Sequence, residues 1–373
     1  MSSTPVAGTT ITATDLAAWR AVATLYNALT TALVVSLVAH RGAAVARDYV
    51  FRHFRHQHLE KFLPGLAKLG LDGQPHAVAC ALYHFHSNAL GGVATEYFRV
   101  SDRKAWVRYP PPRWMWRGTA IAAIPHAVSA AMLHGWHGHN GVSLGNPRLG
   151  FVCTGMTVDG MSGLEGYYLE HERDLAPEER VRFAYGEEAM PRPDPAATPM
   201  LESSSWPPER LARTRRRYAM DYVRTLLVVL QQQLGAADAQ AELGRVARLV
   251  GLQYHEDTAH EFGMRSNLGS GDPASARAFA DWLGALLAGQ GEQVTCELTN
   301  ETASKAAGTS ITLRMPTWRL AEGLALADPG AAFDAWNQLW IGACAAHDRF
   351  LTLETTRTFE HGSLSACWRI STR

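Results

Sequence analysis

The sequence predicts an α+β fold made of two similar halves, each with helices and a small antiparallel sheet that closes with a C-terminal hairpin. Three segments of the first half recur in the same order in the second half, roughly 193 to 206 positions later. A shared order and a nearly constant offset indicate an internal duplication. The chain has 373 residues, which is long enough for two such units to bury a core.

The first repeated segment is a pair of consecutive helices with a glycine between them. An apolar helix ends at Gly42 in the first half and at Gly235 in the second, and another helix starts at once in both places. Glycine suits the left-handed backbone that commonly closes a helix. The most apolar run, residues 28–39, is shorter than a bilayer span and contains Thr30 and Ser36. We therefore expect a buried helix and no membrane partner.

The second and third repeated segments are strands. Val107-Arg108-Tyr109-Pro110 matches Leu313-Arg314-Met315-Pro316, and in each the proline ends the strand because it has no N–H to donate. The third segment matches residues 158–169 with residues 359–370, and without gaps it sets Gly166 opposite Cys367. This alignment predicts that only the second copy kept a thiol at the terminal strand.

The second half shows its elements more clearly than the first. Alternating apolar and polar residues predict strands over 310–315 and 351–356. Between them, residues 331–346 carry large apolar side chains at helical spacing, which predicts an amphipathic helix lying on the sheet. We divide the chain into a first, diverged repeat at 1–175, a proline-rich connection at 176–208 and a second repeat at 209–373.

Composition narrows the range of partners. Lys and Arg total 35, as do Asp and Glu, so no net charge favours nucleic acid. Five widely spaced cysteines without CxxC spacing argue against a disulfide framework or a zinc knuckle. The small, polar residues 1–14 do not resemble a secretion signal, so we expect a cytoplasmic protein. The modest charged fraction, 19%, leaves room for an apolar interface, and a homodimer is one interpretation.

Cys367 is the first chemical candidate. On an alternating strand, Ser365, Cys367 and Arg369 share one face, while Ala366 and Trp368 lie on the other. A neighbouring guanidinium favours the thiolate, which is the nucleophilic form of cysteine. The alternative is a cysteine packed as a small hydrophobic residue.

Two further residues complete this candidate site. His361, just before the turn, is suited to proton transfer near neutral pH, and Glu354 on the partner strand could orient it. The sequence has no GxGxxG, Walker loop or nucleophile elbow, and we expect neither a cofactor nor a metal.

A family resemblance adds to this interpretation. Arg357-Thr358, His361-Gly362-Ser363 and Cys367-Trp368-Arg369-Ile370 together resemble the C-terminal signature of the L-2-amino-thiazoline-4-carboxylate hydrolase family. The upstream helix with Cys344 and Asp348 is also similar to that family, and the resemblance covers residues 217–373. It implies an α+β hydrolase that opens a C–N bond of a cyclic amidine, with Cys367 as the characteristic thiol. Trp368 departs from the acidic residue common at that position.

The favoured function is therefore hydrolysis of a small cyclic amidine. The Cys367 thiolate would attack the amidine carbon, Arg369 would hold a substrate carboxylate, and His361 or an acidic neighbour would protonate the leaving nitrogen. As residues in contact with substrate we predict Ser365, Trp368, Trp114, Glu96 and Glu165, the two carboxylates facing the thiol across the junction between the repeats. The alternative is a small-molecule binding protein that uses the cleft between the repeats without covalent chemistry.

Two histidine groups stay open as metal sites or as packed aromatic surfaces. His84 and His86 would share a face if they lay on a strand, and the second group is His134, His137 and His139. A third segment, 254–261, is superficially similar to HExxH. Its histidines His255 and His260 are five apart, so they do not share a helix face, and a zinc protease is excluded. Glu256 and His260 are helix neighbours and form a surface pair or a proton-handling pair.

Overall fold

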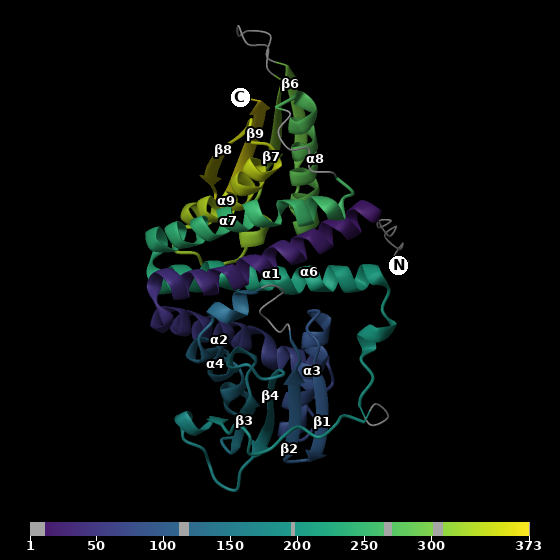
Figure 1. The fold of residues 1–373 in the computed structure, drawn as a ribbon, viewed down its shortest axis with the longest axis vertical. Helices are drawn as coiled ribbons and strands as arrows, with labels where there is room; N and C mark the ends of the chain where they lie inside the picture. The colour runs from purple at the N-terminus through teal and green to yellow at the C-terminus, as the bar shows by residue number, and fades with distance from the viewer. Residues whose placement is uncertain (1–11, 112–118, 195–197, 265–270, 301–308, 373) are drawn as a thin grey trace, which may run out of the picture.

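The computed structural model describes residues 12–111, 119–194, 198–264, 271–300 and 309–372. Two small sheets lie at opposite ends of an elongated molecule, with long helices stacked between them (Figure 1). This arrangement confirms the predicted α+β fold with a sheet in each half.

The described part of the first half contains five α-helices and five strands. They are α1 (Ala13–Arg41), α2 (Ala43–Lys68), α3 (His76–Leu90), β1 (Glu96–Ser101), β2 (Lys104–Tyr109), α4 (His126–Gly135), α5 (Asn140–Ser143), β3 (Leu149–Gly155), β4 (Leu164–Glu170) and β5 (Val181–Phe183).

The second half repeats most of that order. Its elements are α6 (Pro208–Leu234), α7 (Ala236–Glu261), α8 (Pro273–Gln290), β6 (Thr295–Asn300), β7 (Thr309–Met315), α9 (Pro329–His347), β8 (Leu351–Glu360) and β9 (Ser363–Thr372). The strands predicted over 310–315 and 351–356 and the helix over 331–346 are β7, β8 and α9. Both β2 and β7 end at the residue directly before a proline, as expected.

The two sheets share one topology. The first has the order β1-β2-β4-β3-β5 and the second the order β6-β7-β9-β8, with antiparallel pairing between all neighbours except β5, which runs parallel to β3. In each half a hairpin forms one side of the sheet and a second hairpin, after a helix, forms the other. The shared order is what an internal duplication produces.

The glycine joints have nearly identical backbones. Gly42 has φ 85° and ψ 160°, and Gly235 has φ 80° and ψ 162°. Both positive φ values need glycine, but the extended ψ differs from the left-handed helical cap that we expected. At each joint the glycine turns the chain directly from one long helix into the next.

The two halves share one hydrophobic core because their first helices cross between them. Helix α1 packs against α6, α7 and α8, while α6 also packs against α2 and α3. Tyr26 of α1 is fully buried and accepts a hydrogen bond from Trp336 Nε1 of α9 at 2.8 Å. Ser36 of α1 donates to the buried carboxylate of Glu242 on α7 at 2.8 Å. The residue limits of the two repeats stay a prediction.

Helix α1 also has the length and apolar composition of a membrane-spanning helix, the one such helix among the described residues. Most of its apolar stretch is buried within the protein, where it faces α6, α7 and α8.

Strand register corrects the alignment of the terminal strands. Val107 pairs with Gly166 across β2 and β4, and the matching Leu313 pairs with Trp368 across β7 and β9. Gly166 therefore corresponds to Trp368, and the gap-free match to Cys367 is one residue out. A one-residue shift exchanges the two faces of a strand. Gly166 and Trp368 are both buried, whereas Cys367 is half-buried on the other face.

Candidate functional site

The outer face of the second sheet carries Cys367. Along β9, Ser365, Cys367 and Arg369 alternate with buried residues, so the predicted division into two faces agrees with the structure. Arg314 on β7 lies directly opposite Cys367, and its Nη1 is 3.9 Å from the sulfur. Sequence spacing had not identified Arg314 as the neighbouring cation. Glu354 lies opposite Arg369 on β8, on the same outer face.

His361 lies away from this group. It occupies the tip of the β8–β9 hairpin, exposed and with φ 51°. Strand β9 begins only at Ser363, and the four strand steps from there to Cys367 span about 13 Å. The structure therefore does not bring the imidazole to the thiol, because an extended strand carries the two apart.

Trp368 points the opposite way from Cys367. Its side chain is fully buried and donates from Nε1 to Asn337 Oδ1 of α9 at 2.7 Å. A ring held in the core in this way does not reach a ligand on the outer face. The buried ring and its hydrogen bond to Asn337 hold α9 against the sheet.

The expected carboxylates belong to the other end of the molecule. Glu96 on β1 and Glu165 on β4 both bind Arg108, at 2.8 and 3.5 Å. They lie on the first sheet, whereas Cys367 lies on the second, at the opposite end (Figure 1). The structure does not bring them to the thiol, because the long helices separate the two sheets. Trp114 lies outside the described residues.

The stretch before the terminal hairpin holds a buried network. His255 Nε2 lies 3.0 Å from His347 Nδ1, and His347 Nε2 lies 3.1 Å from the carbonyl of Ser275. Because a carbonyl only accepts, His347 carries its proton on Nε2 and accepts from His255 on Nδ1. Asp348 accepts from Ser275 Oγ and from the backbone of Gly271, both at 2.8 Å.

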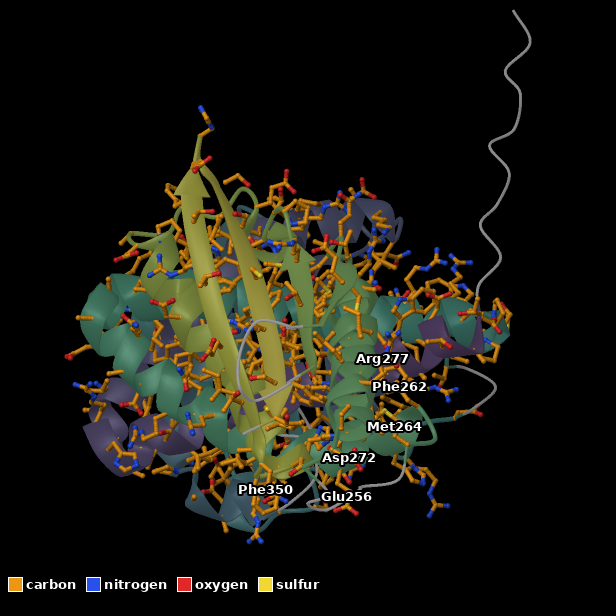
Figure 2. All side chains as sticks on the ribbon, turned by 90° about the horizontal axis from the view of Figure 1, so that it is seen from above. Glu256, Phe262, Met264, Asp272, Arg277 and Phe350 are labelled. Carbon is orange, nitrogen blue, oxygen red and sulfur yellow. The ribbon has the colours of Figure 1, made fainter. Side chains whose placement is uncertain are left out.

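This network joins α7, the start of α8 and the end of α9. Figure 2, which looks along the long axis of the molecule, shows Asp272 and Phe350, the residues that adjoin this network, near the same edge. Glu256 and His260 of α7 are both exposed, so they form no buried proton-handling pair.

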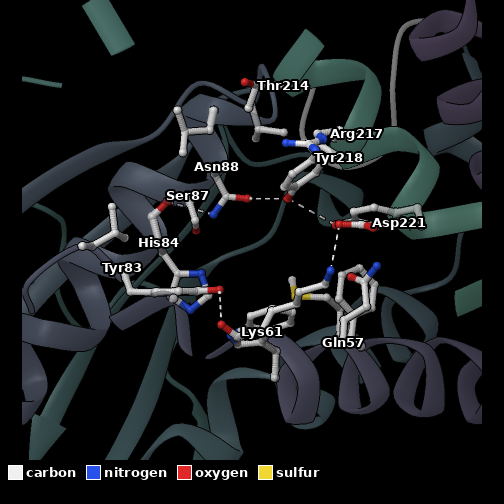
Figure 3. A pocket seen from close by; sticks show the side chains of 18 of the residues that line it. Gln57, Lys61, Tyr83, His84, Ser87, Asn88, Thr214, Arg217, Tyr218 and Asp221 are labelled. Carbon is white, nitrogen blue, oxygen red and sulfur yellow. Dashed lines mark hydrogen bonds and ion pairs between the residues drawn. The ribbon is translucent and has the colours of Figure 1, made fainter. Parts of the chain in front are cut away.

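A cavity lies between the first half and α6. It has a volume of about 330 Å³ and is lined by side chains from α2, α3, β2, α4 and the start of α6 (Figure 3). We call it the α6 cavity. Residues of both halves build it, as we expected for a pocket near their junction.

Aromatic rings form its inner wall. Tyr83 and Trp136 stack at 6.1 Å with 25° between their planes, and His84 stacks on His137 at 4.3 Å with 7°. Tyr109 OH is 3.1 Å from His137 Nε2. One residue from each predicted histidine group is thus brought into the cavity wall.

The histidine groups differ from what the sequence predicted. His84 lies on helix α3 rather than on a strand, so His86 does not share its face. His134 lies near the end of α4, and its carbonyl lies 2.8 Å from His139 Nδ1. Among the described residues, no group of three or more His, Cys, Asp or Glu side chains is placed to hold a metal ion.

A series of side-chain hydrogen bonds lies next to the rings of the cavity wall. Arg55 Nη1 donates to His58 Nδ1 at 2.7 Å, so His58 presents its proton from Nε2 to Asn140 Oδ1 at 3.1 Å. Asn140 in turn donates to Tyr168 OH at 2.9 Å. Burial lowers the pKa of His58 to about 3, which keeps the ring neutral at pH 7. The ring of Tyr168 lies parallel to that of His137 at 5.8 Å, with 3° between the planes.

Polar side chains from α2, α3 and α6 lie at the opening of the α6 cavity. Lys61 Nζ of α2 binds Asp221 Oδ2 of α6 at 2.8 Å. Tyr218 OH donates to Asn88 Oδ1 at 3.2 Å, and Asn88 Nδ2 donates to the carbonyl of His84 at 2.9 Å. Figure 3 shows α6 and α2 facing each other across this opening. The sequence offered no signal for this group, since its members are ordinary polar residues on helix faces.

The other copy of the repeat does not reproduce this lining. With the helices aligned on Gly42 and Gly235, the positions of Lys61, Arg217 and Asp221 are taken by Tyr254, Thr24 and Ala28. With α3 and α8 aligned on Gly91 and Gly291, those of His84 and Asn88 are taken by Gly284 and Ala288.

Buried indole rings lie among the helices of the second half. Trp282 and Trp340 are buried there with ring centroids 6.2 Å apart, and Trp336 adjoins Trp340 at 5.2 Å. A cavity of about 360 Å³ lies in the matching groove between α1 and α7, but Ala28 and Tyr254 line it in place of Asp221 and Lys61, so the polar lining is not repeated there.

Comparisons with protein-family models, with curated proteins and with solved structures found no significant match. The family resemblance of the C-terminal strands therefore stays a prediction, and the geometry of the two sites carries the functional interpretation.

Proposed function

We propose that this protein binds a small planar molecule non-covalently in the α6 cavity. The observation that carries the proposal is a cavity of about 330 Å³ with stacked aromatic rings inside and a few polar groups at its opening. Ligand sites have this composition and occupy about 300–1,000 Å³. The different residues at the matching positions of the other repeat support one ligand per chain.

The proposal separates ligand binding from the cysteine. Cys367 lines neither the α6 cavity nor the cavity of about 360 Å³ between α1 and α7. It lies on the sheet at the far end of the molecule, so a ligand in the α6 cavity does not reach its sulfur (Figure 1). Binding in the α6 cavity corresponds to the alternative function predicted from the sequence, a small-molecule binding protein that uses the cleft between the repeats without covalent chemistry.

A fluorescent probe tests the proposal. N-phenyl-1-naphthylamine is neutral, aromatic and brighter in apolar surroundings, and we expect saturable binding of one molecule per chain. Ser87 lines the cavity from α3 and is half-buried. Ser87→Trp fills the space and weakens probe binding at least tenfold, while Cys367→Ser leaves it unchanged. Thermal unfolding of both variants controls for misfolding. Undiminished binding in a folded Ser87→Trp protein would reject the α6 cavity as the site.

Cysteine-dependent hydrolysis of a cyclic amidine is a second proposal. The observation that favours it is the guanidinium of Arg314 at 3.9 Å from the Cys367 sulfur, with Arg369 and Ser365 on the same face. The thiolate would add to the amidine carbon, the C–N bond would break as the nitrogen is protonated, and water would then release the product. With His361 at the hairpin tip, the proton would come from Glu354 or from water.

Alkylation with iodoacetamide tests the thiol directly. Cys296 on β6 is an exposed cysteine of the same sheet and serves as the matched control. We expect Cys367 to react faster than Cys296 at pH 7, because Arg314 places a cation 3.9 Å from its sulfur. Arg314→Gln removes that difference. Equal labelling rates in the unmodified protein would speak against a nucleophilic Cys367.

A further inference from the structure

We infer that the ligand of the α6 cavity is an aromatic anion whose charged group lies at the opening, beside Lys61 and Arg217, with its ring system inside. This inference rests on the proposed binding function and specifies the chemical class of the ligand. It is carried by the distribution of charge around the opening and by the neutral, planar character of the interior.

The opening carries more cationic than anionic groups. Lys61, Lys68 and Arg217 line the cavity, and the carboxylate among the described lining residues is Asp221. Asp221 neutralises Lys61 at 2.8 Å. Lys68 and Arg217 form no ion pair with any described residue. The chain as a whole has no net charge, so this local excess is a feature of the opening itself.

The position of Arg217 directs its charge toward the cavity. Arg217 precedes Asp221 by four residues on α6, which places the two side chains on one face of that helix. Lys61 meets the same face from α2, as Figure 3 shows. A carboxylate, sulfonate or phosphate at this point would find the guanidinium of Arg217 beside the ammonium of Lys61, whose charge Asp221 offsets. Guanidinium groups are well suited to such oxyanions because they present two donors in one plane.

The interior suits the remainder of such a molecule. Tyr83 and Trp136 present stacked faces, and His84 and His137 form a second, nearly parallel pair. Aromatic faces favour other flat rings at offset-stacked or edge-to-face geometry. Tyr109 and Ser87 add hydroxyl groups that can pair with a heteroatom on the ring. The interior therefore selects for planarity and the opening selects for charge.

Two probes with one ring system separate these contributions. 1-Anilinonaphthalene-8-sulfonate carries the rings of N-phenyl-1-naphthylamine plus a sulfonate. We expect the sulfonate to bind at least tenfold more tightly at low salt, and the difference to shrink as salt screens the opening. Arg217→Gln combined with Lys68→Gln should lower sulfonate affinity to that of the neutral probe and leave the neutral probe unaffected.

Arg215→Gln is the matched control, because Arg215 is an exposed arginine of the same helix that does not line the cavity. Equal affinity of the unmodified protein for both probes overturns the anion inference while the proposed binding function stands. An equal loss of sulfonate affinity in Arg215→Gln and in the variant that combines Arg217→Gln with Lys68→Gln also overturns it, since surface charge would then suffice. If neither probe binds, or if Ser87→Trp does not weaken either, the proposed function itself fails.

Discussion

Neighbouring residues on β9 have opposite surroundings. Trp368 is fully buried against α9, while Cys367, one residue earlier, lies half-buried on the outer face. The alternation of a strand therefore places a packing residue beside a chemically available thiol. The two residues can be changed separately, and their effects on stability should differ widely.

Trp368→Ala should lower the free energy of unfolding by about 3–5 kcal/mol, because it leaves a cavity and removes the donor to Asn337. Cys367→Ala should change it by no more than about 0.5 kcal/mol, as is usual for a surface position. Urea unfolding followed by circular dichroism measures both. Similar losses in the two variants would show that the thiol is packed in the core.

At the scale of elements, glycine sets the distance between α7 and α9. A Cβ at Gly251 would lie 2.0 Å from the carbonyl oxygen of Leu339, and one at Gly342 would lie 2.1 Å from that of Arg248. Backbone atoms cannot move aside independently, so the two helices must separate to admit a methyl group. In the first half, Gly135 of α4 approaches α2 in the same way, with Phe51 O at 2.5 Å from the ideal Cβ.

Gly342→Ala should therefore lower the free energy of unfolding by about 2 kcal/mol or more, because overpacking typically costs about 1–3 kcal/mol and sometimes more. Gly284→Ala is the control within a helix, because its Cβ would meet Leu313 at an ordinary 3.9 Å. That change should be neutral or stabilising by up to about 1 kcal/mol, since alanine favours helix over glycine. Chemical denaturation of the two variants measures this difference. Equal denaturation midpoints would contradict the explanation.

At the scale of the molecule, the two halves are interleaved rather than joined end to end. Helix α1 buries Tyr26 and Leu33 in the shared core, and α6 lines the α6 cavity together with helices of the first half. Neither half can complete its core without a helix from the other.

Fragments 1–194 and 198–373 produced together should associate and unfold in a single transition. Fragment 198–373 alone should aggregate or lack cooperative unfolding, because the surface that α1 covers would be exposed. Co-purification through a tag on one fragment, followed by calorimetry, makes the measurement. Two fragments that each fold as stable monomers would show that the halves are independent.

Stability should also depend on pH through buried histidines. Burial lowers the pKa of His53, His58 and His255 to about 3, against an unfolded value near 6.5. Between these values the unfolded chain binds protons that the folded protein does not. Stability is therefore fully present above pH 6.5 and declines as the pH falls toward 3, by about 1.4 kcal/mol per pH unit for each histidine.

Urea unfolding between pH 7.5 and pH 5 measures this decline. The variant His255→Gln should show a shallower slope, because one of the contributing groups is gone. An unchanged slope in that variant would exclude His255 as a contributor.

Local patterns in the sequence were sufficient for much of the fold. The strands at 310–315 and 351–356, the helix at 331–346 and the face shared by Cys367 and Arg369 arise from side-chain periodicity, which each segment carries by itself. The two-fold repetition was likewise visible in the order of the segments. Strand register was not visible in the sequence, because an alignment without gaps cannot detect a shift of one residue between the two copies.

The candidate site depended on contacts that periodicity does not contain. His84 and His137 were visible as histidines, but their stacking required α3 and the segment after α4 to meet. Lys61 and Asp221 are 160 positions apart, and they meet because α6 crosses to the first half. Residue order thus determined the elements and their repetition, since these arise from neighbours along the chain. Tertiary packing alone determined the cavity, because burial of the long helices decides which distant side chains come together.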